Sequence, residues 1–200
     1  MRRFGSAPEA ETPWIVVGLG NPGQGYAGTR HNVGVRVIET LLARTGGSLK
    51  RHRSGCLAAD ARWGGERVVL ARTAVYMNES GRPVRELVRW YKAHSSRLVV
   101  VHDELDIPFG EVRVKSGGGT AGHNGLGSLV SHLGSKDFVR VRVGISRPPG
   151  RRDPVDYVLS GFSSRERREL PAILERAADA VERIVEVGAD RAMNEINAPP

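Results

Sequence analysis

The sequence predicts an α/β fold with a single domain, in which helices flank a twisted, mixed and mostly parallel sheet. Short apolar runs alternate with segments of helical periodicity along nearly the whole chain. The chain has 200 residues, few enough to share one core, and its 40% hydrophobic and 26% charged residues suit a packed globular protein. We therefore assign residues 14–197 to one domain and expect residues 1–13 to be a disordered leader of small and polar residues.

The expected strands are apolar runs that end in glycine or polar residues. Trp14 to Gly18, Arg67 to Ala71 and Leu98 to Val101 are apolar runs, interrupted only by the arginine that begins the second, as is typical of strands buried on both faces. Two further strands, around Val112 and Val139, alternate valine with basic residues. We expect these two strands to be half exposed, with basic outer faces.

Three helices are expected from apolar residues at helical spacing. The first runs from about Asn32 to Arg44, with Thr29 or Asn32 as a candidate N-cap and Gly46-Gly47 as its end. The second follows the Arg67 strand, and the third runs from Ser164 to Glu186. The buried stripe of the second helix would consist of Val84, Leu87, Val88 and Tyr91.

Composition restricts the classes of function. Thirty Lys and Arg residues against 22 Asp and Glu residues give a formal charge of +8, which favours a nucleic acid as partner over a merely soluble basic protein. Cys56 is the only cysteine, so an intrachain disulfide is excluded and a reducing cytoplasm fits. No run approaches 18 apolar residues, and we expect neither secretion nor membrane spanning.

Three patterns suggest chemistry but lack the context for it. Gly18 to Gly23 matches GxGxxG, yet a proline interrupts it and no acidic residue follows at the required distance, so dinucleotide binding is disfavoured. Gly117 to Asn124 resembles a phosphate-binding loop but has His-Asn where Lys-Ser or Lys-Thr is needed. The acidic cluster from His102 to Asp106 lies on an extended segment, where neighbouring side chains point to opposite sides, and this argues against a metal site.

Five polar residues lie where strands end or helices begin. Asn21, Asn78 and Asp103 each follow a predicted strand, and His31 and Asn124 lie near helix starts. The carboxyl ends of parallel strands and the adjoining helix N-termini form the usual ligand crevice of such sheets, so these five side chains could converge. Taken singly, each is more often a cap or a solvated loop residue, and Asn124 could cap a further helix that contains Leu126, Leu129, Val130 and Leu133.

Four strings of sequence resemble one known family. They are GLGNPGQGYAGTRHNVG (Gly18 to Gly34), YMNESG (Tyr76 to Gly81), VVVHDELDIPFG (Val99 to Gly110) and KSGGGTAGHNGL (Lys115 to Leu126). Their order and spacing are similar to those of the bacterial peptidyl-tRNA hydrolase family, over roughly Trp14 to Asn197. Four separate motifs are far more specific than any single pattern.

The resemblance implies a role for each matching position. His31 would be the catalytic base and Asp103 its partner. Asn21 would be a further catalytic residue. Tyr26, Met77, Asn78 and Asn124 would bind the peptide, and Lys115 and Arg142 would bind a phosphate of the tRNA. This chain departs from the family in its leader and in Tyr76, where phenylalanine is also usual.

The implied reaction is hydrolysis of the ester between a peptide, or an N-blocked amino acid, and tRNA, which releases free tRNA. His31 would activate water while Asp103 fixes its tautomer, and no metal or cofactor is needed. We expect a cytoplasmic monomer that acts on peptidyl-tRNA without an obligatory protein partner. The alternatives are a non-catalytic RNA-binding protein on the same scaffold and a nucleotide-dependent enzyme that uses the glycine loops.

Overall fold

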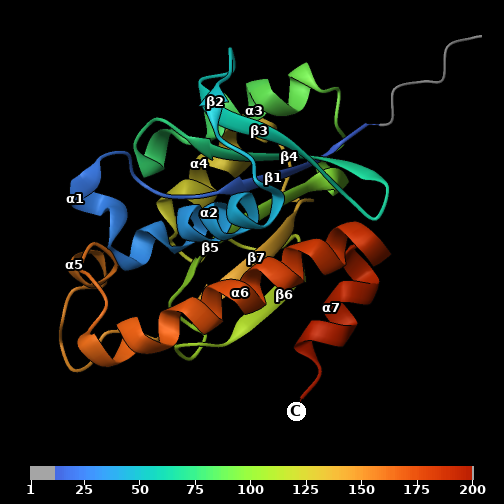
Figure 1. The fold of residues 1–200 in the computed structure, drawn as a ribbon. Helices are drawn as coiled ribbons and strands as arrows, with labels where there is room; N and C mark the ends of the chain where they lie inside the picture. Colours follow the sequence, from blue (N-terminus) through green and yellow to red (C-terminus); the bar gives the residue numbers. More distant parts are fainter. Residues whose placement is uncertain (1–11, 200) are drawn as a thin grey trace, which may run out of the picture.

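The computed structural model describes residues 12–199, so nearly all of the expected leader at residues 1–13 lies outside the described residues. One seven-stranded sheet, in the order β2-β3-β4-β1-β5-β7-β6, carries helices on both faces (Figure 1). The strands are β1 (Trp14–Gly18), β2 (Lys50–Arg51), β3 (Cys56–Trp63), β4 (Glu66–Thr73), β5 (Leu98–Glu104), β6 (Val112–Ser116) and β7 (Val139–Gly144). The helices are α1 (Gln24–Ala27), α2 (Val33–Thr45), α3 (Gly81–Trp90), α4 (Asn124–Leu133), α5 (Pro154–Val158), α6 (Ser164–Val187) and α7 (Ala189–Asn197), with 3-10 turns η1 (Arg30–Asn32), η2 (Met77–Glu79) and η3 (Ser95–Arg97).

The sheet is parallel in its centre and antiparallel at its edges. The central strands β4, β1, β5 and β7 pair in parallel, whereas β2 with β3, β3 with β4, and β6 with β7 are antiparallel. This confirms the predicted mixed α/β sheet. The hairpin partner β3 is absent from the prediction, because its alanines and charged residues lack the apolar run that marks the central strands.

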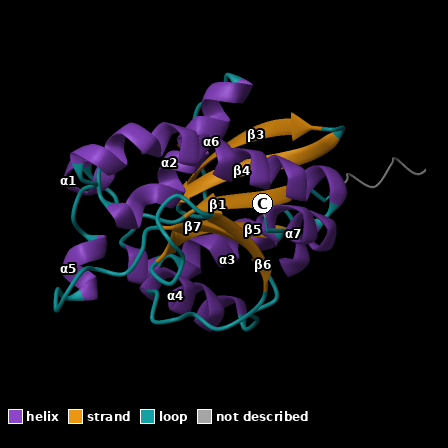
Figure 2. Cartoon of the chain, turned by 90° about the horizontal axis from the view of Figure 1, so that it is seen from below, coloured by secondary structure: helices purple, strands orange, loops and turns teal. Residues whose placement is uncertain are grey.

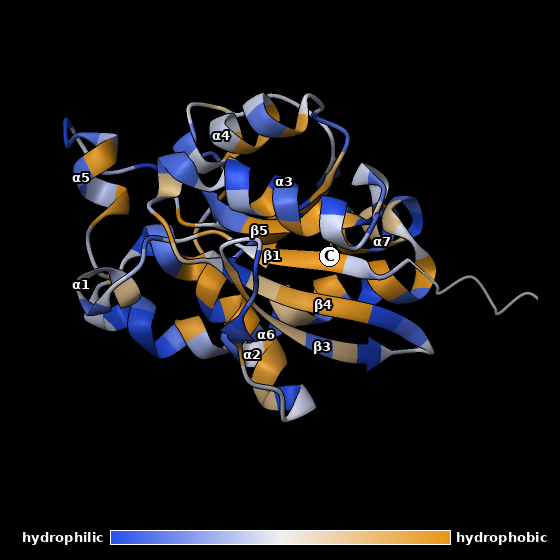
Figure 3. Cartoon of the chain, turned by 90° about the horizontal axis from the view of Figure 1, so that it is seen from above, coloured by the Kyte–Doolittle hydropathy of each residue, from blue (hydrophilic) through white to orange (hydrophobic). Residues whose placement is uncertain are grey.

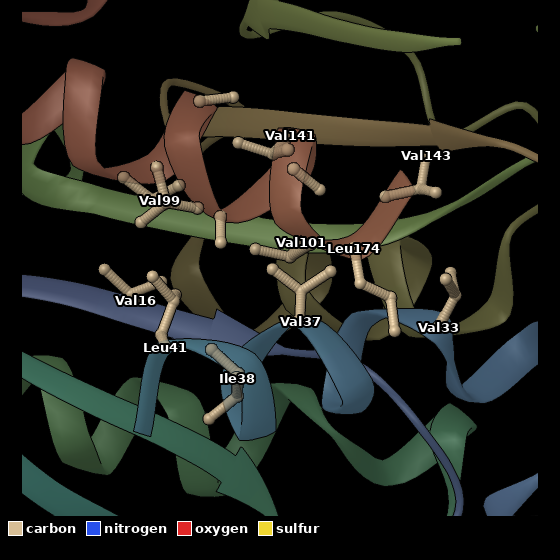
Figure 4. Packing of buried hydrophobic residues seen from close by; sticks show 14 of the residues in the cluster. Val16, Val33, Val37, Ile38, Leu41, Val99, Val101, Val141, Val143 and Leu174 are labelled. Atoms are coloured by element: carbon tan, nitrogen blue, oxygen red, sulfur yellow. The ribbon is translucent and has the colours of Figure 1, made fainter. Parts of the chain in front are cut away.

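Two hydrophobic cores cover the two faces of the sheet. Val16 of β1 packs with α2 and α6, while Ile15 and Val17 face α3 and α4. Figure 4 shows the first of these cores, with Val16 and Val37 among the labelled side chains. Burial on both faces explains why the central strands are continuously apolar, and Figure 3 shows this apolar centre against the more hydrophilic helix surfaces.

A glycine contact sets the start of α2 against the sheet. A Cβ at Gly34 would overlap the carbonyl oxygen of Val101, so only glycine lets the first turn approach β5 this closely. Asn32 occupies the N-cap position, as expected, but its side chain does not cap the helix. The close approach places η1, with His31, directly beside the end of β5.

The exposed edge of β6 is covered by the C-terminal helix. The Asn197 side chain accepts a hydrogen bond from the Val114 backbone N–H at 2.9 Å and donates one to its carbonyl oxygen at 2.7 Å. These bonds extend the ladder by one side chain and remove an unpaired edge. Among the described residues, none of the helices combines the length and apolar character needed to cross a lipid bilayer.

One expectation about the basic strands is wrong. Arg140 of β7 is only 3% exposed, and its guanidinium donates to the carbonyl oxygens of Gly118 and Gly119. The guanidinium carbon also lies 4.8 Å from the ring centroid of Phe138. The glycine loop after β6 folds over this strand, so the basic outer face predicted for β7 is partly buried.

Candidate active site

The polar residues expected to converge lie at the carboxyl end of the parallel strands. Asn21 follows β1, Asn78 lies in η2 after β4, and Asp103 is near the end of β5. Figure 2 shows the loops at this end of the sheet gathered between α1 and α5. Parallel strands end on the same side, so their following loops share one edge.

His31 and Asp103 are in contact although 72 positions separate them in the chain. His31 Nδ1 lies 2.9 Å from Oδ1 and 3.0 Å from Oδ2 of the carboxyl group. Both residues are buried. A carboxylate only accepts hydrogen bonds, so Nδ1 is the protonated nitrogen of the neutral ring and Nε2 carries the lone pair.

A second histidine, His123, shares the same carboxylate. Its Nε2 lies 3.0 Å from Asp103 Oδ1, and its Nδ1 accepts from the backbone N–H groups of Gly125 and Leu126 at 3.1 and 3.3 Å. An Nδ1 that accepts carries no proton, so this ring is neutral and donates from Nε2 to Asp103. His123 therefore caps α4, the role that the sequence allowed for Asn124, and Asn124 is the first residue of the helix.

Sequence reasoning missed His123, although one signal was available. The pair His123-Asn124 repeats the pair His31-Asn32, and both precede a helix of the predicted fold. Only the second residue of one pair and the first residue of the other were assigned to the site. The structure uses both histidines on the same carboxylate.

The environment of Asp103 keeps its carboxyl group ionised. Burial by itself raises the pKa of this carboxyl, but the positive charge that His123 or His31 carries when protonated, together with the hydrogen bonds that both rings donate, more than offsets burial and holds the pKa well below its usual range. The three side chains bring possible metal-ligating atoms within 4.8 Å of one another. Binding a metal would require the histidines to give up their hydrogen bonds to the carboxylate.

Asn21 is held in one orientation by its neighbours. Its Oδ1 accepts from the Met77 backbone N–H at 2.8 Å, so the amide nitrogen Nδ2 remains for other partners. Its backbone N–H and carbonyl oxygen bond the Asn32 side chain at 2.8 and 2.9 Å. Asn32, which the sequence suggested only as a cap, thus fixes the loop that carries Asn21.

These groups line an open cavity of about 430 Å³. Its polar wall includes His31 and Asn21, and its other wall is apolar and formed largely by α5. The full lining consists of Asn21, His31, Tyr76, Met77, Asn78, Leu105, Gly122, Asn124, Pro154, Val155, Val158 and Leu159. Tyr26 does not line the cavity, but its ring meets Tyr76 edge to face, with centroids 6.3 Å apart. A cavity with amides on one wall and apolar side chains on the other suits a peptide chain.

Known proteins are similar to this chain over almost its whole length. The family model described as peptidyl-tRNA hydrolase matches residues 15–200. The peptidyl-tRNA hydrolase of Frankia casuarinae is 56% identical over 191 residues, 96% of this chain and 97% of that protein, and the one of Kineococcus radiotolerans is 54% identical, covering 93% and 98%. The crystal structure of peptidyl-tRNA hydrolase from Acinetobacter baumannii has a TM-score of 0.86 at 34% identity and covers 96% of this chain and 98% of that one. The chain belongs to the peptidyl-tRNA hydrolase family.

Family membership confirms the resemblance seen in the sequence. The chain is a hydrolase of peptidyl-tRNA, and the alternative of a nucleotide-dependent enzyme loses its basis. The glycine loop at Gly117 to Gly119, on which that alternative relied, instead supplies carbonyl oxygens to Arg140.

A buried arginine next to His31 holds the apolar wall of the cavity. The Arg30 guanidinium donates to the carbonyl oxygens of Ser160 and Gly161 at 3.3 and 2.6 Å and pairs with Glu166 at 2.7 Å. It also lies 4.2 Å from the ring centroid of Tyr157 in α5. The segment η1 therefore positions the base and, through the adjacent arginine, the wall across the cavity.

The basic residues proposed for tRNA binding lie outside this cavity. Lys115 and Arg142 line a separate hollow of about 450 Å³ at the β6–β7 edge, together with Arg113. Lys115 is exposed, whereas Arg142 is half-buried and pairs with Glu104 at 3.0 Å. The structure therefore brings these two cations to one hollow but leaves only Lys115 without a strong internal partner there.

Proposed function

We propose that His31, held by Asp103, activates the water with which this enzyme hydrolyses the ester between a peptide and tRNA. The observation that carries the proposal is the bifurcated hydrogen bond from His31 Nδ1 to both oxygens of the Asp103 carboxylate, at 2.9 and 3.0 Å, where His31 lines the cavity. This contact fixes the tautomer in which Nε2 can accept a proton. The family, the contact and the cavity all support the same chemistry.

The reaction then needs one proton to move twice. Nε2 of His31 takes a proton from water as the water oxygen attacks the ester carbonyl carbon, which gives a tetrahedral oxyanion. The oxyanion collapses, the bond between the carbonyl carbon and the ribose oxygen breaks, and the imidazolium returns the proton to the leaving ribose oxygen. The products are tRNA with a free hydroxyl and a peptide with a free carboxylic acid, which then releases its own proton to bulk water and becomes a carboxylate. Asp103 stabilises the transient imidazolium through its negative charge.

Asn21 is the best placed amide to meet the reacting ester. Its Oδ1 is occupied by the Met77 N–H, so Nδ2 can donate to the developing oxyanion. Asn78 and Asn124 are exposed on the same cavity and can bind the amide groups of the peptide. Met77 would contact the peptide side chains. Tyr26 would contribute to the same contact through the exposed Tyr76, whose ring it meets edge to face.

The RNA part of the substrate would contact the β6–β7 edge. Lys115 and Arg142 lie on neighbouring antiparallel strands and line one hollow, an arrangement that suits a terminal phosphate. The formal charge of +8 favours tRNA over neutral esters at long range. We further propose that the enzyme works in the cytoplasm as a monomer, without a cofactor, because translation supplies its substrate there and its single cysteine suits a reducing compartment.

The deciding experiment replaces the base. His31→Ala should lower kcat on N-acylated aminoacyl-tRNA by about 10²- to 10⁴-fold, the usual contribution of a general base, with little change in affinity for tRNA. The matched control is His94→Ala, which removes an exposed histidine at the start of η3. Unblocked aminoacyl-tRNA should be cleaved far more slowly by the unaltered enzyme.

Two results would contradict the proposal. Turnover by His31→Ala equal to that of the His94→Ala control would remove His31 from the chemistry. Failure of the unaltered chain to release N-acylated amino acid from tRNA would favour the non-catalytic RNA-binding alternative.

A further inference from the structure

A second basic surface lies at the β2 edge of the sheet, far from the β6–β7 edge. Strand β2, the turn that follows it and the end of α3 form it, together with the start of β4 (Figure 1). It contains seven cations, Lys50, Arg51, Arg53, Arg67, Arg85, Arg89 and Lys92, against two carboxylates, Asp60 and Glu86. We call it the β2–α3 surface. Since the whole chain has a formal charge of +8, much of the excess positive charge is concentrated here.

An exposed tryptophan lies at the centre of the β2–α3 surface. Trp90 is 51% exposed, although burying such a ring is strongly favourable. The Arg53 guanidinium carbon lies 4.5 Å from its ring centroid, and the His52 ring meets it edge to face at 5.7 Å. His52 also stacks on Tyr91 at 5.7 Å. The ring is thus held in place by neighbours that leave about half of it open to solvent.

The cations next to this ring are available to a ligand. The two carboxylates are occupied, because Asp60 pairs with Arg67 at 2.8 Å and Glu86 pairs with Arg85 and Arg89 at 3.2 and 3.7 Å. Within residues 12–199, the remaining four cations make no ion pair. These four are Lys50, Arg51, Arg53 and Lys92, and all of them are exposed. Arg53 lies over the ring, and Lys50, in register with Ala58, lies on the α3 face of the sheet, whereas Arg51, in register with Leu57, points to the opposite face. Exposed cations beside an open aromatic ring match the phosphates and bases of a nucleic acid.

The β2–α3 surface is separate from the catalytic cavity. Helix α3 begins beside α4, where the Gly81 N–H donates to Ser128 Oγ at 2.9 Å, and its ten residues carry Trp90 about 15 Å along the axis. Tyr91 then meets Arg67 at the amino end of β4, whereas the cavity lies at the carboxyl ends. The strand order puts β2 and β6 at opposite edges, six strand spacings or about 29 Å apart.

We propose that the β2–α3 surface is a second RNA-binding surface, which pairs phosphates with its exposed cations and stacks an unpaired base on Trp90. The ligand is an RNA segment with at least one unstacked base, either in the tRNA substrate itself or in a separate RNA. This inference does not depend on the role of His31. Stacking on an aromatic ring tolerates any base, so binding here is not sequence-specific.

The test measures binding of deacylated tRNA and of a short unstructured RNA oligonucleotide by fluorescence anisotropy over a range of salt concentrations. Trp90→Ala should weaken oligonucleotide binding by about fivefold to a hundredfold, the range for one stacked base, and Trp90→Phe should retain most of the affinity. Lys50→Ala with Arg53→Ala should lower the slope of log affinity against log salt by about 1.4. The control, Arg168→Ala with Arg191→Ala, removes two exposed arginines of α6 and α7 and should leave the slope unchanged.

A kinetic comparison identifies the source of the RNA. If Trp90→Ala lowers kcat/KM for full-length peptidyl-tRNA but not for an N-acylated amino acid esterified to a short CCA oligonucleotide, the surface binds the body of the substrate. If oligonucleotide affinity falls while both kcat/KM values hold, the surface binds a separate RNA; each result supports the proposal. Wild-type affinity and salt slope in the Trp90 and Lys50/Arg53 variants, shown to be folded by circular dichroism, would overturn it. So would an equal loss in the control, and neither result would bear on His31.

Discussion

Two regions of the molecule contain charged groups but use them differently. One is the corner formed by His31, Asp103 and His123, and the other is the β6–β7 edge with Lys115 and Arg142. In the corner, Asp103 receives two N–H donors, from His31 and His123, and all three groups are largely withdrawn from water. At the edge, Arg142 pairs with Glu104 while Lys115 stays exposed. A buried carboxylate must find donors, so its geometry is fixed by the fold, whereas a surface cation can exchange partners at little cost.

This difference separates what each region can do. The corner is preorganised, so it can hold one tautomer of His31 throughout the reaction. The edge can rearrange at the exposed Lys115, whereas Arg142 can contact a phosphate only while it also keeps the buried Glu104 as a partner. This difference supports the proposal that the chemistry occurs at the corner and that the RNA docks at the edge.

At the corner, Asp103→Asn should lower kcat more than His123→Asn. Its amide can donate to His31 Nδ1 and so favour the tautomer with the proton on Nε2, where a base is needed. We expect kcat to fall by about 10³- to 10⁴-fold with tRNA affinity retained. Single-turnover kinetics with N-acylated aminoacyl-tRNA would measure the loss. A fall of less than tenfold would mean that Asp103 only supports the fold.

A smaller loss should follow from His123→Asn. Asparagine is a good N-cap and can replace the histidine at the start of α4, but it is too short to donate to Asp103 as the imidazole does. Asp103 is then left with His31 as its donor and is less firmly oriented, so we expect kcat on N-acylated aminoacyl-tRNA to fall by about tenfold with tRNA affinity retained. A loss of thermal stability with unchanged kcat would indicate a structural role instead.

The position of the corner could be predicted from the sequence because parallel strands all end at the same edge of a sheet. Asn21, Asn78 and Asp103 each follow an apolar run, and parallel strands bring such positions together. His123 could not be assigned in this way, since a helix cap and a carboxylate ligand look alike in sequence. Pairing of β3 was equally hidden, because an edge hairpin needs no continuous apolar run.

The basic edge was predicted less well for a related physical reason. Alternation of valine with arginine gives the face of each side chain but not whether a loop covers that face. Arg140 points to the same face as Lys115, its cross-strand partner, yet the glycine loop buries it. Burial by a distant loop is a tertiary property that the period of the strand does not contain.

Comparing cations within the edge sharpens this point. Lys115→Ala should lower the slope of log tRNA affinity against log salt by about 1, as expected for one phosphate contact, and Lys115→Ala with Arg142→Ala by about 2. Arg140→Ala should leave the slope unchanged and lower the thermal midpoint, because its guanidinium is spent on backbone carbonyls. Titrations at several salt concentrations distinguish the variants. Equal slopes for Lys115→Ala and the unaltered enzyme would exclude a phosphate contact at Lys115.

The smallest effect concerns the buried histidine beside the corner. Burial, reinforced by the neighbouring His123, lowers the pKa of His102 to about 3 from an ordinary value of 6.5. The unfolded chain therefore binds more protons at this residue below pH 6.5, so its stabilising contribution is full above that pH and is lost progressively as the pH falls toward 3, by at most about 1.4 kcal/mol per pH unit. His102→Gln removes this titration, and urea unfolding between pH 6.5 and 4.5 should then show a flatter dependence of the free energy of unfolding on pH. The exposed His132→Gln is the matched control and should keep the original slope. If the two variants share one slope, His102 gains its proton between pH 6.5 and 4.5 in the native enzyme as it does in the unfolded chain. Burial would then not keep His102 neutral over that range.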